Sequence, residues 1–243
     1  MFFLKKDHRP YFVKKLYLDF QEFYVKHFLE PQFESLGTGF TFIKPWNVEI
    51  FGSPILLGDH ANVIATSDKK IRLTIWSDSD EKGAIKIGNC CLLCPGVRIS
   101  SAEEIVVGDN CMIANGTYIT DSDWHGIYNR VVPIGNTGKV TLEENVWVGD
   151  SSIICKGVTI SKNSIIGAGS VVVNDIPPNS IAVGNPAVVV KKLDEEKEFT
   201  TRSHWYADPK ALSKEIDMID RDMLKNNTLL EWIKTLIIPK KGN

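Results

Sequence analysis

Residues 140–171 read VTLEENVWVGDSSIICKGVTISKNSIIGAGSV, and a pattern of side chains in this stretch returns every six residues. One slot of the pattern holds an aliphatic residue, at Leu142, Val148, Ile154, Ile160 and Ile166. The second slot follows four positions later and holds a small or branched residue, at Val146, Ser152, Val158, Ser164 and Ser170. Helices repeat near 3.6 residues and ordinary strands repeat at 2, so neither element produces this period.

A coil of three short, flat strands with tight corners explains the period of six. Two inward side chains per strand fill a triangular interior, and three steps of six residues complete one coil, as from Leu142 to Ile160. Successive coils then stack through parallel backbone hydrogen bonds, about 4.8 Å apart. Self-similarity at a fixed period is typical of solenoids. The sequence therefore predicts an all-β solenoid with helical ends, in which hexapeptide repeats build a parallel β-helix.

The two slots continue upstream and are then interrupted by a long loop. They hold Ile87 with Cys91, Leu93 with Val97, Val107 with Cys111, and Ile113 with Thr117. The register breaks between Ile119 and Leu142. Polar loops that interrupt a rigid solenoid often carry its function, because the coils supply a fixed scaffold. We therefore expect a catalytic loop at residues 120–141.

Both ends of the chain have the composition of helices. An apolar stripe that includes Phe12, Leu16 and Phe20 indicates a helix near the start, where it can cover the open end of the first coil. After Lys192 the chain becomes charged, and Asp208-Pro209 is a favourable helix start. We predict an N-terminal helical cap at 1–47, the β-helix at 48–190 and a C-terminal helical tail at 191–243.

Composition excludes several classes of partner. The 243 residues are 43% hydrophobic and carry a formal net charge of −2, which does not favour nucleic acid as a ligand. No apolar run reaches the ~20 residues of a membrane span. The first ten residues, MFFLKKDHRP, are apolar for only three positions, unlike a signal peptide. We therefore expect a cytoplasmic protein.

Five cysteines, at positions 90, 91, 94, 111 and 155, include a Cys-x-x-Cys pair at Cys91 and Cys94. Such a pair can bind metal or do redox chemistry. A zinc site would want a second close pair, which the sequence lacks. Cys91 and Cys111 also fall in the small inward slot, where a free cysteine packs as a small hydrophobe. We therefore expect no metal.

His125 is the strongest catalytic candidate, because it lies in the interrupting loop within the acidic segment 121–126, DSDWHG. The other histidines lie in the flanking segments or in an early coil. A neighbouring carboxylate can fix the tautomer of an imidazole and raise its basicity, which suits a general base near pH 7. The sequence therefore predicts acid–base chemistry at this loop.

The end of the repeat carries the segment 166–172, IGAGSVV, followed by residues 174–180, NDIPPNS, and residues 184–187, GNPA. With residues 146–150, VWVGD, these segments resemble the hexapeptide-repeat acyltransferases. Within that family the chain is similar to the maltose and galactoside O-acetyltransferase branch. The resemblance implies a left-handed β-helix, a homotrimer and an acyl-CoA donor, here acetyl-CoA.

The resemblance also implies roles for residues of the loop. The family's catalytic histidine follows the rung that runs here from Ile113 to Tyr118, and His125 matches it. His125 would take a proton from the acceptor as the acceptor attacks the thioester. Either Asp121 or Asp123 would orient the imidazole, and both stay open. A backbone N–H between Trp147 and Asp150 would stabilise the oxyanion.

For the donor we expect a groove beside small residues whose backbone amides stay open to the pantetheine arm, and a basic residue near the CoA phosphates. The donor candidates are Trp147, Gly149, Asp150, Gly167, Ala168 and Lys191. For the acceptor we expect the positions Cys94, Asn115, Trp124 and Tyr128. The family's acceptor-binding asparagine is replaced here by Cys94, so the acceptor can differ from galactosides.

These patterns predict an acetyl-CoA-dependent acyltransferase that acts on a hydroxyl of a sugar or saccharide. The alternative is an N-acetyltransferase that acts on an amino-sugar or an antibiotic amine. Two further readings use the same coil without acyl transfer. One is a trimeric scaffold with no catalytic role, and the other is a zinc-dependent enzyme of the carbonic anhydrase kind, which would need three converging histidines.

Overall fold

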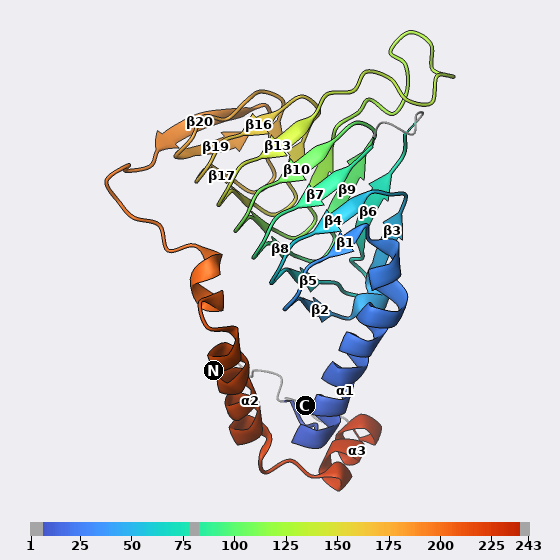
Figure 1. Ribbon diagram of the computed structural model, residues 1–243, viewed down its shortest axis with the longest axis vertical. Helices are drawn as coiled ribbons and strands as arrows, with labels where there is room; N and C mark the ends of the chain where they lie inside the picture. The colour runs from blue at the N-terminus through green and yellow to red at the C-terminus, as the bar shows by residue number, and fades with distance from the viewer. Residues whose placement is uncertain (1–6, 78–82, 239–243) are drawn as a thin grey trace. The chain divides into compact units, whose positions relative to one another are not determined.

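The computed structural model describes residues 7–77 and 83–238 (Figure 1). The first six residues, part of the segment from which the lack of a signal peptide was predicted, lie outside this range. The chain divides into two compact units, a coil unit from Tyr24 to His204 and a helical unit made of both chain ends.

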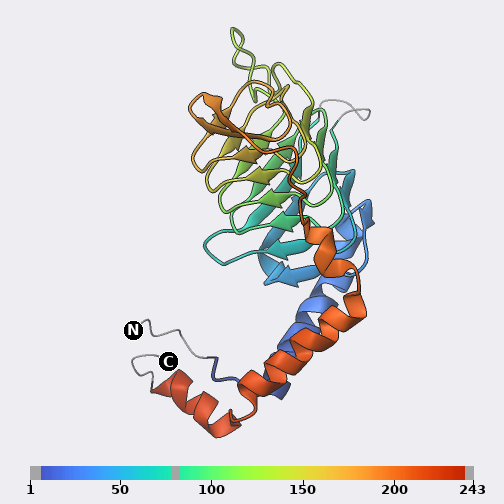
Figure 2. The ribbon, with the colours of Figure 1, turned by 90° about the vertical axis from the view of Figure 1, so that its left-hand side faces the viewer.

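The coil unit is a left-handed parallel β-helix in which three sheets form the walls of a prism (Figures 1 and 2). Each coil contributes one strand to each sheet, and every pairing between successive coils is parallel. The first three coils are β1 (Ser35–Leu36), β2 (Thr41–Ile43) and β3 (Val48–Phe51); β4 (Ile55–Leu57), β5 (Asn62–Ile64) and β6 (Ile71–Ile75); and β7 (Ile85–Ile87), β8 (Leu92–Leu93) and β9 (Arg98–Ser101).

The next three coils complete the regular stack. They are β10 (Ile105–Val107), β11 (Met112–Ile113) and β12 (Tyr118–Thr120); β13 (Val140–Leu142), β14 (Trp147–Val148) and β15 (Ile153–Ile154); and β16 (Thr159–Ile160), β17 (Ile165–Ile166) and β18 (Val171–Val172). An antiparallel pair, β19 (Ser180–Gly184) and β20 (Ala187–Lys192), closes the stack on β17. We call the wall formed by β3, β6, β9, β12, β15 and β18 sheet C.

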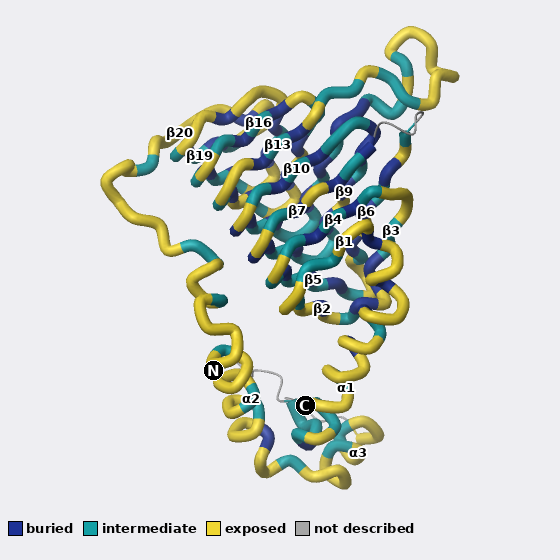
Figure 3. The backbone as a smooth tube through the Cα atoms, in the orientation of Figure 1, coloured by how far each residue is buried: buried dark blue, intermediate teal, exposed yellow. Residues whose placement is uncertain are grey.

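The two slots of the sequence repeat are the interior of the prism. Every residue of the aliphatic slot in this stretch is 0% exposed: Leu142, Val148, Ile154, Ile160 and Ile166. The serines of the small slot, Ser152, Ser164 and Ser170, are also 0% exposed. Figure 3 shows buried segments recurring in every coil, beside exposed ones. The buried serines donate to carbonyls, as Ser152 Oγ does to Gly167 O at 3.0 Å, so their hydroxyls are not buried without a partner.

One corner of the prism carries asparagines in the left-handed region, where Asn is tolerated better than most residues. Asn110, Asn145, Asn163 and Asn179 have φ between 54° and 62°. Asn145 Nδ2 donates to Asn163 Oδ1, and Asn163 Nδ2 donates to Asn179 Oδ1, both at 3.0 Å. The ladder of amides lets successive coils turn at the same place.

The coil begins earlier than the boundary predicted at residue 48. Strands β1 and β2 lie at 35–43, inside the predicted helical cap, and pair in register with β4 and β5. The second slot of this coil holds the large residues Phe40 and Trp46 instead of small ones, so it does not match the repeat pattern. A helical turn still covers the first coil, because Val25 and Leu29 of the π-helix η1 (Val25–Leu29) belong to the buried core.

The helical unit contains most of α1 (Tyr11–Tyr24) together with α2 (Pro209–Leu224) and α3 (Leu229–Ile237). Lys14 Nζ lies 2.6 Å from Asp220 Oδ1, and the Tyr11 hydroxyl donates to Asp217. Asp208 is the N-cap of α2, as expected, and accepts from Ala211 N. None of the described helices is long and apolar enough to cross a membrane.

Candidate functional site

The interrupting loop, residues 121–139, leaves sheet C after β12 and returns as a narrow hairpin. Ser122 and Thr137 form an antiparallel bridge, Asp123 N donates to Asn136 O at 2.9 Å, and Gly135 N donates to Asp123 O at 2.6 Å. Figures 1 and 2 show this hairpin projecting beyond the stacked coils. The predicted loop of 120–141 is thus an ordered protrusion whose position is set by the coil below it.

Asp121 anchors the base of the hairpin and does not face His125. Its carboxylate accepts from Ala102 N at 2.7 Å and Glu103 N at 3.0 Å, and it lies 2.7 Å from Ser101 Oγ. The side chain is fully buried. The prediction that Asp121 orients the imidazole is wrong in this protomer, because both carboxylate oxygens hold the turn after β9.

Asp123 is also engaged away from His125. Its Oδ1 accepts from Lys156 Nζ at 2.7 Å, which ties the hairpin to the following coil. His125 itself is exposed, and in the described part of the chain no side chain hydrogen-bonds to its imidazole. Neither predicted carboxylate therefore orients His125 within one protomer.

Trp124 fixes the chain next to His125. Its Nε1 donates to the Tyr118 hydroxyl at 3.0 Å, and the Arg98 guanidinium lies over the Tyr118 ring, 4.3 Å from the centroid. Trp124 is therefore held against sheet C rather than free to stack on a ligand. Tyr128, the other aromatic candidate, is 99% exposed near the tip of the hairpin.

The tip of the hairpin is apolar as well as exposed. Ile127 is 53% exposed and Val131 is 86% exposed, beside the exposed ring of Tyr128. Loop tips in water are usually polar, and exposed apolar groups gathered together mark contact surfaces.

The donor candidates lie in the fifth and sixth coils, but most of their amides are not open. Gly149 N donates to Ile166 O at 2.8 Å, and Gly167 N donates to Ala182 O at 2.9 Å. The prediction of a row of free glycine amides is therefore wrong, because the ladder between coils uses them. Gly149 is needed for another reason, since a Cβ there would lie 2.6 Å from the Ala168 backbone nitrogen.

Among the donor candidates, the amides of Asp150 and Ala168 have no acceptor in the described part of the chain. Both residues are exposed, at corners of adjacent coils. Trp147 is 46% exposed on the outer face of β14, and Lys191 is exposed on β20. The donor candidates thus share one end of the coil.

The acceptor candidates Cys94 and Asn115 lie at the corner before sheet C, whereas the His125 hairpin leaves from the far end of that sheet. Asn115 Oδ1 accepts from Lys69 Nζ at 2.7 Å. One protomer therefore does not bring Cys94 or Asn115 together with His125 along a single corner.

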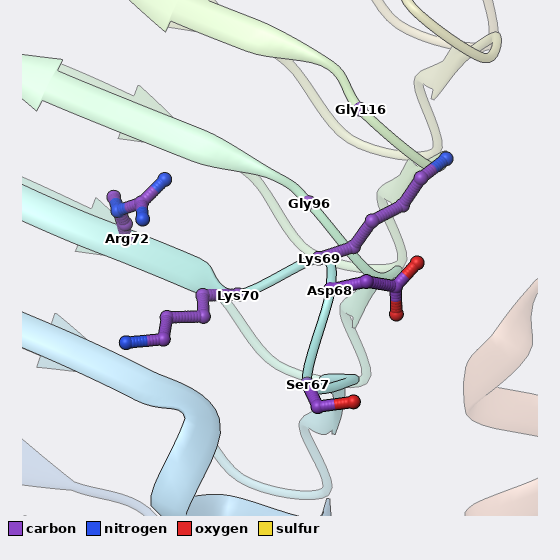
Figure 4. Close-up of a pocket in the computed structure, with 7 residues that line it drawn as sticks. All are labelled: Ser67, Asp68, Lys69, Lys70, Arg72, Gly96 and Gly116. Carbon is purple, nitrogen blue, oxygen red and sulfur yellow. The ribbon is translucent and has the colours of Figure 1, made fainter.

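Sequence reasoning missed a basic pocket of about 300 Å³ at this corner (Figure 4). Ser67, Asp68, Lys69, Lys70 and Arg72 line it from the second coil, and Gly96 and Gly116 leave space beside them. In Figure 4 the Lys69 side chain runs toward Gly116, while the Lys70 side chain runs the other way. The run from 67 to 72 offers a sequence signal, because its three cations stand in a stretch where the repeat is weak.

The cysteines are all free, and Cys91 and Cys111 are fully buried in the core. The hydrogen bond with Cys111, together with burial, raises the pKa of Cys91, which keeps its thiol protonated. Across residues 7–77 and 83–238, no group of three His, Cys, Asp or Glu side chains converges as a metal site.

The buried Asp121 predicts a pH dependence of stability. Burial raises its pKa and outweighs the hydrogen bonds from Ser101, Ala102 and Glu103. The Ser101 hydroxyl also donates to Ala84 O at 3.0 Å, and its one proton cannot serve two acceptors. A protonated Asp121 removes this conflict, because it can donate to Ser101.

A raised pKa means that the folded state holds this proton more tightly than the unfolded chain. The contribution of Asp121 to the free energy of unfolding should therefore be largest in acid. It should fall as pH rises from the ordinary carboxyl range through the raised pKa. We expect the stability difference between wild type and Asp121→Asn to shrink with rising pH in urea titrations. A difference that grows with pH would contradict the raised pKa.

Two family models match the coil. Residues 139–174 match the bacterial transferase hexapeptide with six repeats, and residues 84–121 match the hexapeptide repeat of succinyl-transferase. A Staphylococcus aureus protein named "Putative acetyltransferase" is 35% identical over 116 residues, which are 42% of this chain and 58% of the relative. A Saccharomyces cerevisiae protein of the same designation is 40% identical over 104 residues, 42% of this chain and 53% of the relative. The chain thus spans little more than half the length of these curated relatives.

The fold is similar to that of AntD, an N-acyltransferase from Bacillus cereus. Its crystal structure in complex with dTDP and 3-hydroxybutyryl-CoA superposes with a TM-score of 0.57 and 22% identity, covering 72% of this chain and 89% of that one. A mutant of AntD was crystallised with dTDP-4-amino-4,6-dideoxyglucose and coenzyme A, and superposes with a TM-score of 0.56 at 22% identity, covering 72% and 90%.

Proposed function

Because residues 139–174 and 84–121 match hexapeptide-repeat models of transferases, we propose that the chain is an acyltransferase that moves an acetyl group from acetyl-CoA to a sugar or saccharide. The observation that carries the proposal is the exposed imidazole of His125 on a hairpin that the coil and two anchoring carboxylates hold in place. The named relatives support acetyl transfer as the reaction.

In the proposed reaction His125 acts as a general base. Its imidazole nitrogen takes the proton of an acceptor hydroxyl while the hydroxyl oxygen attacks the thioester carbonyl. The carbon–sulfur bond then breaks, and the imidazolium returns the proton to the CoA thiolate. General-base assistance of this kind contributes about 100- to 10,000-fold to the rate.

The tetrahedral intermediate needs a donor for its oxyanion, and the free backbone amides of Asp150 and Ala168 are our candidates. Trp147 N and Gly149 N are excluded from this role because they donate to Ser164 O and Ile166 O. A preorganised backbone donor aimed at an oxyanion is typically one of the larger contributions to acyl transfer. With Gly149, Gly167, Trp147 and Lys191 nearby, we propose this end of the coil for the donor.

We further propose that the protein works as a homotrimer. His125 has no orienting partner in its own protomer, and the apolar tip at Ile127, Tyr128 and Val131 is exposed. A neighbouring coil would cover that tip and supply the group that orients the imidazole. This arrangement also accounts for the separation of Cys94 and Asn115 from His125 within one chain.

An amine acceptor is the second candidate. The structural neighbour AntD is an N-acyltransferase and was crystallised with an amino-sugar nucleotide, whereas the residues at Cys94 and Asn115 do not select between a hydroxyl and an amine. A neutral amine attacks the thioester by the same route and gives its proton to the same imidazole.

The proposed function is tested by incubating the protein with acetyl-CoA and a panel of sugars, nucleotide-sugars and amines. Chromatographic detection of CoA and acetylated product avoids interference from the five free cysteines. We expect product with at least one sugar-based acceptor, and thermal stabilisation by acetyl-CoA, because a ligand that binds only the folded state raises stability. Absence of both stabilisation by acetyl-CoA and transfer to any acceptor would favour a scaffold role.

A further inference from the structure

A row of side chains that includes two arginines crosses the outer face of sheet C and ends at the strand before the His125 hairpin. Glu49, Arg72, Arg98 and Tyr118 occupy successive strands in register, so their side chains share one face. Lys69 and Lys70 immediately precede β6, the strand that contains Arg72. The row ends at Tyr118, whose hydroxyl accepts from Trp124, the residue before His125. The row therefore ends next to the proposed catalytic loop.

The carboxylates nearby do not balance these charges. Glu49 pairs with both Lys70 and Arg72, each at 2.6 Å, and these bonds lower the pKa of its carboxyl. Arg98 has no carboxylate partner among the described residues. Asp68 lines the pocket. The cations Lys69, Lys70, Arg72 and Arg98 therefore stand beside two acids, Glu49 and Asp68, in a chain whose net charge is −2.

The register itself points to a ligand. Arg72 and Arg98 are direct neighbours on parallel strands, about 4.8 Å apart. Like charges placed opposite one another on adjacent strands destabilise a sheet. Both guanidinium groups are exposed, so they can reach a bound anion. Arginine presents planar donors that match phosphate oxygens in pairs, and an anion between the two would turn their repulsion into binding.

The position along the coil separates these cations from the donor candidates. Arg72 lies in the second coil and Arg98 in the third, whereas Ala168 lies in the sixth. Arg72 and Ala168 are therefore about 19 Å apart along the axis of the β-helix, because four coil spacings separate them. The His125 hairpin leaves from the fourth coil, between the two regions. An anion on the row is therefore on the side of His125 opposite to the proposed acetyl-CoA groove.

We propose that Arg72 and Arg98 bind a diphosphate of the acceptor, which is then a nucleoside diphosphate sugar rather than a free saccharide. This inference rests on the proposed acyl transfer and assigns its acceptor class. Two cationic groups one coil apart fit two linked phosphates, and the pocket beside Gly96 and Gly116 leaves room for the group attached to them. The sugar would extend along sheet C past Tyr118 to His125.

Calorimetric titration of the full-length protein tests the subsite directly. The probes are inorganic pyrophosphate and thymidine diphosphate, each with and without saturating CoA. We expect both to bind wild type, and Arg98→Gln to weaken binding by about tenfold or more, because a charge-assisted hydrogen bond is lost. The affinity of Arg98→Lys should lie between that of wild type and that of Arg98→Gln, since lysine keeps the charge without the planar fork of donors. Lys86→Gln, on the outer face of β7 in another sheet, is the matched control and should bind as wild type.

The outcomes separate this inference from the proposed function. No pyrophosphate binding by wild type, or equal binding by Arg98→Gln, overturns the subsite even when acetyl transfer to neutral sugars is found. Displacement of pyrophosphate by CoA would assign the row to the donor and overturn the acceptor assignment. His125→Ala should bind pyrophosphate as tightly as wild type. Pyrophosphate binding can therefore be tested even if no acetyl transfer is found. Circular dichroism and light scattering on each variant exclude loss of fold or assembly as the cause.

Discussion

Replacing His125 by alanine is expected to lower kcat for acetyl transfer by about 100- to 10,000-fold, the usual worth of a positioned general base. The side chain is exposed and makes no hydrogen bond to another described side chain, so its removal should not disturb the fold. Acetyl-CoA binding should stay at the wild-type value in calorimetry, because the proposed donor groove lies in the fifth and sixth coils. Steady-state kinetics with the best acceptor of the panel provides the measurement.

A second exposed histidine serves as the control for this variant. His27 lies in η1, outside the coils, and its ring stacks edge-on against Phe28. His27→Ala should retain wild-type turnover. Turnover of His125→Ala close to that of wild type would remove His125 from the chemistry, and a loss shared equally by His27→Ala would point to assembly or stability instead.

Replacing Ile154 by alanine is expected to lower the free energy of unfolding of the coil by about 2–5 kcal/mol. The side chain is 0% exposed in the prism interior, where its removal leaves a cavity that neighbouring coils cannot fill without shifting. Ile154→Val removes less volume and should cost about 0.5–1.5 kcal/mol. Urea unfolding followed by tryptophan fluorescence measures both.

The preceding residue supplies a control in the same strand. Ile153 points outward from β15 and is 38% exposed. Ile153→Ala should change the free energy of unfolding of an isolated protomer by less than about 0.5 kcal/mol, the usual range for surface positions. Equal losses for the two variants would mean that the inward slots of the repeat do not carry the core.

Much of the fold follows from the periodicity alone. The aliphatic positions Leu142, Val148 and Ile160, predicted to face inward, are all 0% exposed. Such a repeat is readable because each coil places the same two slots at the same spacing. The first coil was missed because its second slot holds Phe40 and Trp46, where later coils hold small residues. Packing on the next coil, rather than local preference, makes β1 and β2 strands.

The candidate functional site could be predicted only in part from the sequence. The break in the repeat singled out the hairpin, and within it His125 stood among carboxylates. Which atoms those carboxylates bind could not be read from spacing. Asp121 turns down to the backbone of Ala102, and Asp123 turns to Lys156 of the next coil. Both partners come from segments remote in sequence.

By itself the sequence determined that this chain coils with a six-residue step, which side chains fill the prism, and where the coil is interrupted. These properties depend on hydrophobic burial repeated at one spacing, which is a local property of the chain. Only the tertiary structure decided which groups meet. Arg72 and Arg98 become neighbours on sheet C because parallel stacking sets residues a full coil apart side by side. The same stacking uses the glycine amides of the donor region, since each strand must satisfy its backbone on the next.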